Sequence, residues 1–156
     1  MDNIFSGIEL VKVNSESQKQ YFLPGRFRVR IENVLLHKKR LGGHVFVVET
    51  TVVESNNPEI QPGEARNWVQ PMEMDAAMPR VKCFIGAAKG YDPKRNLDDI
   101  NKIVTQTLCE DVVSGKIVFE GVILDLECFN RRSNKTGKSF TIHLWSPAKG
   151  KSMSEN

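Results

Sequence analysis

Gly137-Lys138-Ser139 is the segment whose residue types most directly suggest chemistry, because this tripeptide ends the phosphate-binding loop of many nucleotide-binding proteins. That loop has the pattern Gly-x-x-x-x-Gly-Lys-Ser, lies between a strand and a helix, and wraps phosphate with backbone N–H groups. Here Arg132 occupies the first glycine position, and the following run, "SFTIHLW", alternates as a strand does. Both requirements fail, so we expect Gly137 to be a hairpin-turn residue.

Two carboxylates and three histidines are the other candidates for a reactive site. Asp125 and Glu127 alternate on one face of an expected strand, a pattern that can hold a divalent metal for nuclease chemistry. Alternating carboxylates are more often a solvated strand edge. His37, His44 and His143 lack the spacings typical of metal sites. We expect no metal, no cofactor and no enzymatic activity, and a metal nuclease is kept as an alternative.

The overall composition is that of one ordinary globular domain. The chain has 156 residues, a formal net charge of +3 and a pI of about 8.8, which is too mild to identify a polyanionic partner by itself. It lacks an apolar run of 18 residues and an amino-terminal export pattern, so neither a membrane partner nor secretion is expected. Cys83, Cys109 and Cys128 show no CxxC spacing. They are typical of reduced, largely buried thiols in a cytoplasmic protein.

Period-two alternation predicts three strands in the first half of the chain. In the first, residues 26–36, Phe27, Val29 and Ile31 share one face, and Arg26, Arg28, Arg30 and Glu32 share the other. Residues 44–55, rich in β-branched side chains, form the second strand and complete a hairpin. Residues 65–72 form a shorter third strand that ends at Pro71.

Two helices and two more strands are predicted in the second half. A helix begins near Pro79, buries Val81, Phe84, Ile85 and Ala88, and stops at Gly90. A second helix runs from an Asn96 N-cap to Gly115 and buries Ile100, Ile103 and Val104. Asp98 and Asp99 lie in its first turn, where the positive end of the helix dipole stabilises acidic side chains. Strands follow at residues 116–129 and 139–145.

This element order predicts a mainly β protein with a helical insertion between its third and fourth strands. That is the order of an OB-fold, a five-stranded Greek-key barrel whose ligand face combines strands two and three with the loops after strands one and four. We expect a single domain over residues 1–148, with residues 1–24 as an extension packed on it, and a disordered tail at residues 149–156.

Basic residues concentrate on the first strand and in those two loops. The loops are "HKKRLGG" and "NRRSNKTGK", and neither contains an acid. A solvated surface is the plain explanation for each run alone, but their coincidence with both ligand loops favours a nucleic-acid partner. The expected contact cations are Arg28, Arg30, Lys38, Lys39, Arg40, Arg66, Arg131, Arg132, Lys135 and Lys138.

Aromatic side chains are the second requirement, because exposed bases stack on them. Trp68 shares a strand face with Arg66 and Gln70, and it is either a stacking or a core residue. Trp145 is expected to be partly exposed, because a buried trio of Phe140, Ile142 and Leu144 occupies the other face of the last strand. Phe129 is a third stacking candidate, and Phe46 is assigned to the core.

Several segments together resemble a known family. They are "LPGRFRVRIENVLLHKKRLGGHVFVVETTVVES", "PGEARNWVQ", "FIGAAKG" and "KTGKSFTIHLW". Over residues 20–148 they look like bacteriophage-encoded OB-fold proteins regarded as single-stranded DNA-binding proteins. The resemblance implies a sequence-tolerant protein that coats or protects single-stranded DNA in host cytoplasm during phage DNA replication or recombination.

The partners expected from these patterns are single-stranded DNA, with RNA as an alternative polymer, and replication or recombination proteins. A homo-oligomer is compatible with them. The alternative from a different class is an OB-fold module of a phage that binds a host or replication protein, with the basic loops meeting an acidic surface.

Overall fold

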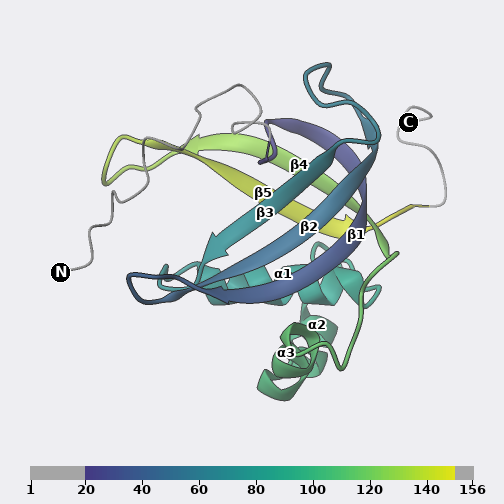
Figure 1. Cartoon of the computed structure of the whole chain (residues 1–156), viewed down its shortest axis with the longest axis vertical. Helices are drawn as coiled ribbons and strands as arrows, with labels where there is room; N and C mark the ends of the chain where they lie inside the picture. The colour runs from purple at the N-terminus through teal and green to yellow at the C-terminus, as the bar shows by residue number, and fades with distance from the viewer. Residues whose placement is uncertain (1–19, 150–156) are drawn as a thin grey trace.

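The computed structural model describes residues 20–149, which form a curved five-stranded antiparallel sheet with helices packed against one end (Figure 1). The sheet order is β3-β2-β1-β4-β5. The strands are β1 (Gly25–Lys38), β2 (His44–Ser55), β3 (Ala65–Pro71), β4 (Ile123–Arg132) and β5 (Ser139–Pro147). The helices are α1 (Ala77–Ala88), α2 (Leu97–Ile103) and α3 (Gln106–Val113). The predicted mainly β class, with helices between the third and fourth strands, is confirmed.

Strand β1 is the centre of the sheet because it pairs on both sides. Residues Phe27–Lys38 pair with β2, and residues Gly25–Arg30 pair with β4. Two register irregularities, at Arg28/Val29 and Ile31/Asn33, interrupt the β1–β2 ladder. Bulges of this kind bend a strand and increase its twist. As a result the two edge strands, β3 and β5, come to face one another across a gap.

The predicted inward face of the first strand is confirmed. Phe27, Val29 and Ile31 are fully buried, whereas Arg26 and Arg30 are exposed on the other face. Phe46 is buried as expected, and its ring contacts those of Trp68 and Phe84. The core therefore joins the concave face of the sheet to α1.

The face assignment of the last strand is wrong. Trp145 is only 3% exposed and stacks on Phe84 of α1, while Phe140 and Leu144 are on the exposed side. The register explains this result: Trp145 pairs with Leu126 and His143 with Cys128, and paired residues share a sheet face. Leu126 and Cys128 are buried, so His143 and Trp145 turn toward the core with them.

Several boundaries differ from prediction for local reasons. Strand β4 begins at Ile123, seven residues later than predicted, after a turn at Gly121, and runs to Arg132 because its last residues pair with Ser139–Thr141. The second predicted helix is two helices, separated where Thr105 caps α3 by accepting from the Leu108 N–H. Asn96 precedes α2 without capping it, because its Oδ1 accepts from the Asp92 N–H.

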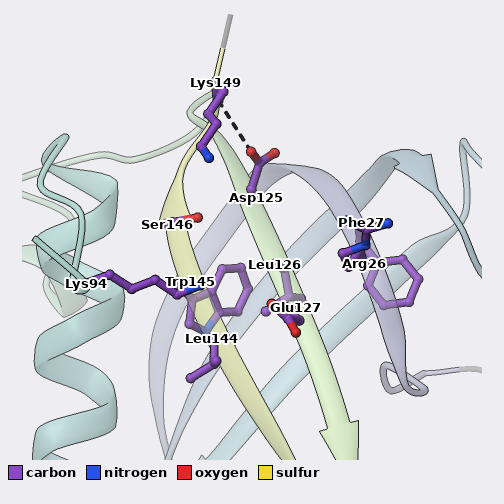
Figure 2. A pocket seen from close by; sticks show the side chains of 10 residues that line it. All are labelled: Arg26, Phe27, Lys94, Asp125, Leu126, Glu127, Leu144, Trp145, Ser146 and Lys149. Atoms are coloured by element: carbon purple, nitrogen blue, oxygen red, sulfur yellow. Dashed lines mark hydrogen bonds between the residues drawn. The ribbon is translucent and has the colours of Figure 1, made fainter. Parts of the chain in front are cut away.

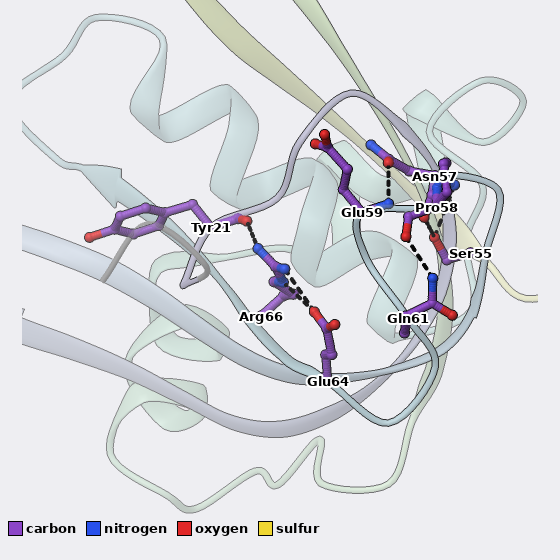
Figure 3. Close-up of polar contacts among 8 residues, drawn as sticks. All are labelled: Tyr21, Ser55, Asn57, Pro58, Glu59, Gln61, Glu64 and Arg66. Carbon is purple, nitrogen blue, oxygen red and sulfur yellow. Dashed lines mark hydrogen bonds and ion pairs between the residues drawn. The ribbon is translucent and has the colours of Figure 1, made fainter. Parts of the chain in front are cut away.

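Arg66 and Trp68 share a strand face as predicted, but this face is the core. Arg66 is 1% exposed, so its assignment as a nucleic-acid contact is corrected. Its guanidinium pairs with Glu64 at 2.7 Å and donates to the Tyr21 carbonyl at 2.9 Å (Figure 3). The Asn67 N–H donates to the Gln20 carbonyl. These contacts hold residues 20 and 21 against the edge of β3. Trp68 is equally buried, at 3% exposure, which settles its two alternatives in favour of the core.

The other predictions concern the cysteines, membrane-spanning helices and the two ends of the chain. Cys128 is buried, Cys83 and Cys109 are half-buried, and none forms a disulfide. Burial raises the pKa of all three thiols. No helix within residues 20–149 is long and apolar enough to cross a membrane. Most of the predicted amino-terminal extension and the disordered tail fall outside the described residues, although Phe22 does belong to the core.

The buried Arg66 predicts a large effect on stability. Replacing it by alanine removes the ion pair to Glu64 and leaves the Tyr21 carbonyl without this donor. We expect Arg66→Ala to lower the free energy of unfolding by about 2–4 kcal/mol. Exposed Arg95 provides the control, since Arg95→Ala should change stability by less than about 0.5 kcal/mol. Urea unfolding measures both; equal stability of the two variants would contradict the structural role of Arg66.

Candidate functional site

The β1–β2 loop, residues 39–43, is a tight basic turn bound to Glu73, the second residue after β3. The Lys39 N–H donates to the Gly43 carbonyl, and Glu73 accepts from the His44 N–H and from Lys39 Nζ. Gly43 has a φ of +82°, and a Cβ there would overlap the Glu73 carboxylate. The pKa of Glu73 is lowered, chiefly because its carboxylate accepts from the backbone N–H of Glu73 itself, with further contributions from Lys39 and the His44 N–H. The loop therefore presents Lys38 and Arg40 from a fixed position.

The β4–β5 loop, residues 133–138, is a second basic turn. Ser133 and Lys138 close it through a backbone hydrogen bond of 2.9 Å, and Gly137 has a φ of +70°. Because β5 begins at Ser139, no helix follows the Gly-Lys-Ser tripeptide, and the exclusion of a phosphate-binding loop is confirmed. Four cations have exposed positions in or beside this loop and form no ion pair within the described residues: Arg131, Arg132, Lys135 and Lys138.

A groove lies between the edges of β3 and β5, and we call it the β3–β5 groove. It consists of two adjoining pockets of about 330 and 160 Å³ that share Val69, Pro71, Thr141 and His143. Its other lining residues are Tyr21, Phe22, Asn67, Trp68, Gln70, Met74, Arg80 and Phe140. None of these described lining residues is an acid. The groove therefore contains no fixed negative charge that would repel an anionic ligand.

Both basic loops border one end of this groove. The β4–β5 loop leads directly into Phe140, and the β1–β2 loop is bound to Glu73, next to Met74. Phe140 and Met74 line the same pocket. The two loops extend toward the same side of the molecule, at the left of Figure 1. The tertiary structure thus combines two basic turns with one acid-free groove.

Two aromatic rings on the walls of the groove are accessible. Tyr21 is 50% exposed, and its ring extends away from Arg66 in Figure 3. Phe140, on the opposite wall, is 36% exposed. Trp68 and Trp145 lie in the core, so their prediction as stacking residues is corrected. Phe129 is half-buried and lies under the guanidinium of Arg131, 5.7 Å from ring centroid to Cζ.

The floor of the groove carries Arg80 and His143. Arg80, from α1, donates to Gln70 Oε1 at 3.1 Å and lies 5.9 Å from the centroid of the Phe140 ring. Burial, aided by the charge of Arg80, lowers the pKa of His143 to about 4. The imidazole is therefore neutral near pH 7, and Arg80 supplies the positive charge on the floor.

The arginines predicted on the first strand are largely compensated. Arg28 forms an ion pair with Asp125 at 2.8 Å, and this hydrogen bond raises the pKa of the guanidinium. Arg30 pairs with Glu32 at 2.7 Å. Neither lines the groove. The assignment of Arg28 and Arg30 as nucleic-acid contacts therefore stays a prediction, one that lies outside the groove.

A separate pocket of about 160 Å³ lies beside β4 and β5 (Figure 2). Its charged lining mixes Arg26, Lys94 and Lys149 with Asp125 and Glu127, and the Lys149 N–H donates to Asp125. Charges of both signs give this pocket little preference for an anion. The acid-free β3–β5 groove is the stronger candidate for a polyanion.

The carboxylates suspected of nuclease chemistry do not form a metal centre in the part of the chain that the structure describes. Asp125 is engaged by Arg28, and no group of three or more histidine, cysteine or acidic residues within residues 20–149 could hold a metal ion. The metal-nuclease alternative therefore has no supporting geometry there.

Sequence reasoning missed Tyr21, Arg80 and Phe140. Tyr21 lies before the first predicted strand, Arg80 belongs to the helical insertion, and Phe140 was placed in the core. The alternation in "SFTIHLW" correctly places Phe140 on the strand face opposite His143 and Trp145, but alternation alone does not say which of the two faces is buried. For Arg80 the sequence carries no signal, because its role depends on where α1 packs.

Comparison with known proteins adds no assignment. No protein-family model matches the chain, and no curated protein matches it. The site is therefore defined by its own geometry.

The lowered pKa of His143 predicts a pH-dependent stability. In the unfolded chain the imidazole binds a proton near pH 6.5, whereas in the folded protein it does so near pH 4. Between these values the unfolded state binds more protons, so the free energy of unfolding falls as the pH falls. We expect a loss of roughly 1–2 kcal/mol from pH 7 to pH 5, and a smaller loss for His143→Gln. Urea unfolding of both proteins at both pH values measures this, and an identical pH dependence would rule out His143 as its source.

Proposed function

We propose that this protein binds single-stranded nucleic acid, with DNA as the polymer, in a sequence-tolerant and non-enzymatic manner. The observation that carries the proposal is the acid-free groove between β3 and β5, bordered at one end by both basic loops. A polyanion with exposed base faces matches this combination, because the loops offer cations to phosphates and the groove offers aromatic rings to bases.

The sheet order supports an OB-fold as the finer description of this architecture. In a partly open five-stranded Greek-key barrel, the first strand pairs with both the second and the fourth, and the third and fifth strands face one another. The order β3-β2-β1-β4-β5 is what such a barrel has when it is open between β3 and β5. The ligand surface of that fold includes the loops after the first and fourth strands, which here are the two basic loops.

Binding on this surface would be mainly electrostatic and therefore salt-sensitive. Neutralising phosphates releases condensed counterions, and affinity for single strands falls with salt by a slope of about 0.7 per phosphate contacted. The cations proposed to make these contacts are Lys38, Lys39, Arg40, Arg131, Arg132, Lys135 and Lys138. Lys39 is also bound to Glu73, so its contribution is shared with holding the loop.

The biological setting follows only from the family resemblance. In this proposal the protein is a phage-encoded single-stranded DNA-binding protein that coats or protects DNA during replication or recombination in the host cytoplasm. RNA is the alternative polymer. Self-association and binding to replication or recombination proteins are compatible with this proposal.

One observation favours a protein-binding module as the second candidate. Leu41, which directly follows the cations Lys38, Lys39 and Arg40, is 80% exposed. An exposed apolar side chain next to cations suits an acidic protein surface with an apolar pocket. Nucleic-acid binding separates the two candidates: no binding to single-stranded or duplex DNA at low salt supports the protein partner, and preference for duplex DNA excludes base stacking.

The salt dependence of oligo-dT binding tests the proposed function. We expect Arg131→Glu/Arg132→Glu to bind more weakly at low salt and to reduce the steepness of the salt dependence by about 1–1.5, because two phosphate contacts are lost. Fluorescence anisotropy at several salt concentrations measures both quantities.

A charge-matched control is available in and just before α2. Arg95→Glu/Lys102→Glu changes the net charge equally at exposed positions that line neither pocket of the groove. It should retain the salt dependence of the unmodified protein. Equal behaviour of the two double variants would show that Arg131 and Arg132, at the end of β4, make no specific contact.

A further inference from the structure

Arg80 is a cation inside the β3–β5 groove that the proposed role of the two loops does not use. It lies in the first half of α1, is only partly exposed, and lines the pocket of about 160 Å³. Its guanidinium contacts the Gln70 amide oxygen and the Phe140 ring. No carboxylate among residues 20–149 forms an ion pair with it.

This arrangement contrasts with the other sheltered arginines of the structure. Arg28 and Arg66 are both paired with carboxylates, at 2.8 and 2.7 Å. A partly desolvated cation without a counter-charge is costly, because its lost hydration is only partly replaced by neutral partners. An anion that enters the groove would supply the missing counter-charge.

Neighbouring residues keep Arg80 in position for such a ligand. Gln70 is 2% exposed and is itself fixed, because its Nε2 donates to the Pro71 carbonyl while its Oε1 accepts from Arg80. The planar guanidinium retains donors for the paired oxygens of a phosphate. Beside it, the partly exposed ring of Phe140 offers a surface to a flat apolar group.

We propose that one nucleotide of a bound single strand enters the β3–β5 groove, with its phosphate on Arg80 and its base against Phe140. This inference rests on the proposed function and adds the path of the strand: the strand passes into the gap between the sheet edges, beyond the two loops. Tyr21, on the other wall, is the surface available to a neighbouring base.

The chemistry of the groove favours a nucleotide over a carboxylate of a peptide. A carboxylate alone would satisfy Arg80 but would leave the two exposed rings without a partner. A nucleotide combines an anion with a flat ring, and base–aromatic stacking contributes about 1–3 kcal/mol per base. Arg80 and Phe140 line the smaller pocket of about 160 Å³. The adjoining pocket of about 330 Å³, which Tyr21 lines, is at the small end of the range for ligand sites and gives room for a neighbouring base.

The base contact is tested with Phe140→Leu, which keeps an apolar side chain and removes the ring. We expect affinity for oligo-dT to fall about fivefold or more, and affinity for an abasic strand of the same length to stay unchanged. Leu144→Ala is the control, since Leu144 is exposed on the same strand but lines the separate pocket beside β4. It should alter neither affinity.

The phosphate contact is tested with Arg80→Gln. Loss of one phosphate contact should reduce the steepness of the salt dependence by about 0.7 on both oligo-dT and the abasic strand. Arg95→Gln, with the same change of charge at an exposed position outside the groove, should leave the salt dependence unchanged. Thermal unfolding of each variant verifies that the fold is retained.

The outcomes separate this inference from the proposed function. If the loop variant Arg131→Glu/Arg132→Glu reduces the salt dependence while Phe140→Leu and Arg80→Gln bind as the unmodified protein does, the groove path is overturned and the proposed function stands. Equal loss by Phe140→Leu on both strands also overturns the base contact. If the unmodified protein binds neither strand, both are overturned.

Discussion

The double pairing of β1 is the constraint on which the rest of this structure depends. This strand of 14 residues pairs with β2 from Phe27 to Lys38 and with β4 from Gly25 to Arg30. Two register irregularities in the β1–β2 ladder allow β1 to bend. This bend curves the sheet so that its two edge strands face one another. The groove exists because those edges, β3 and β5, are not joined by a ladder in the described residues.

The core and the groove share the same side chains, which couples stability to the shape of the site. Trp68 contacts Phe46, Phe84, His143 and Trp145, and it also lines the groove from beneath. The Trp145 indole Nε1 is buried without a hydrogen-bond partner in the described structure, so apolar burial outweighs the cost of one unsatisfied donor. Arg66 adds a polar anchor by holding the Tyr21 carbonyl at the edge of β3. The walls of the groove are consequently held by the same contacts that stabilise the fold.

The local positive charge of a surface depends on which cations form ion pairs as well as on how many cations it contains. On the sheet, Arg28 forms an ion pair with a carboxylate on a neighbouring strand and Arg30 with one on its own strand, and each pair partly offsets the positive charge. In the β4–β5 loop, the cations lie on a turn whose sequence contains no acid. A net charge of +3 therefore underestimates how basic the end of the groove is. The same reasoning explains why a run of arginines on a strand is weaker evidence for a polyanion partner than a run in an acid-free loop.

The sequence by itself determined the local features of this protein. Period-two alternation located β1, β2 and β3, the spacing of apolar residues located α1, and glycine chemistry identified Gly137 as a turn residue. These features depend mainly on residues that are close in the sequence, so short sequence patterns are enough to predict them. The tertiary structure alone decided which face of β5 is buried, because that choice depends on the register with β4 and on the aromatic rings of α1. It alone brought Tyr21, Arg80 and Phe140 to one groove, since their proximity arises from the curvature of the sheet and not from any spacing along the chain.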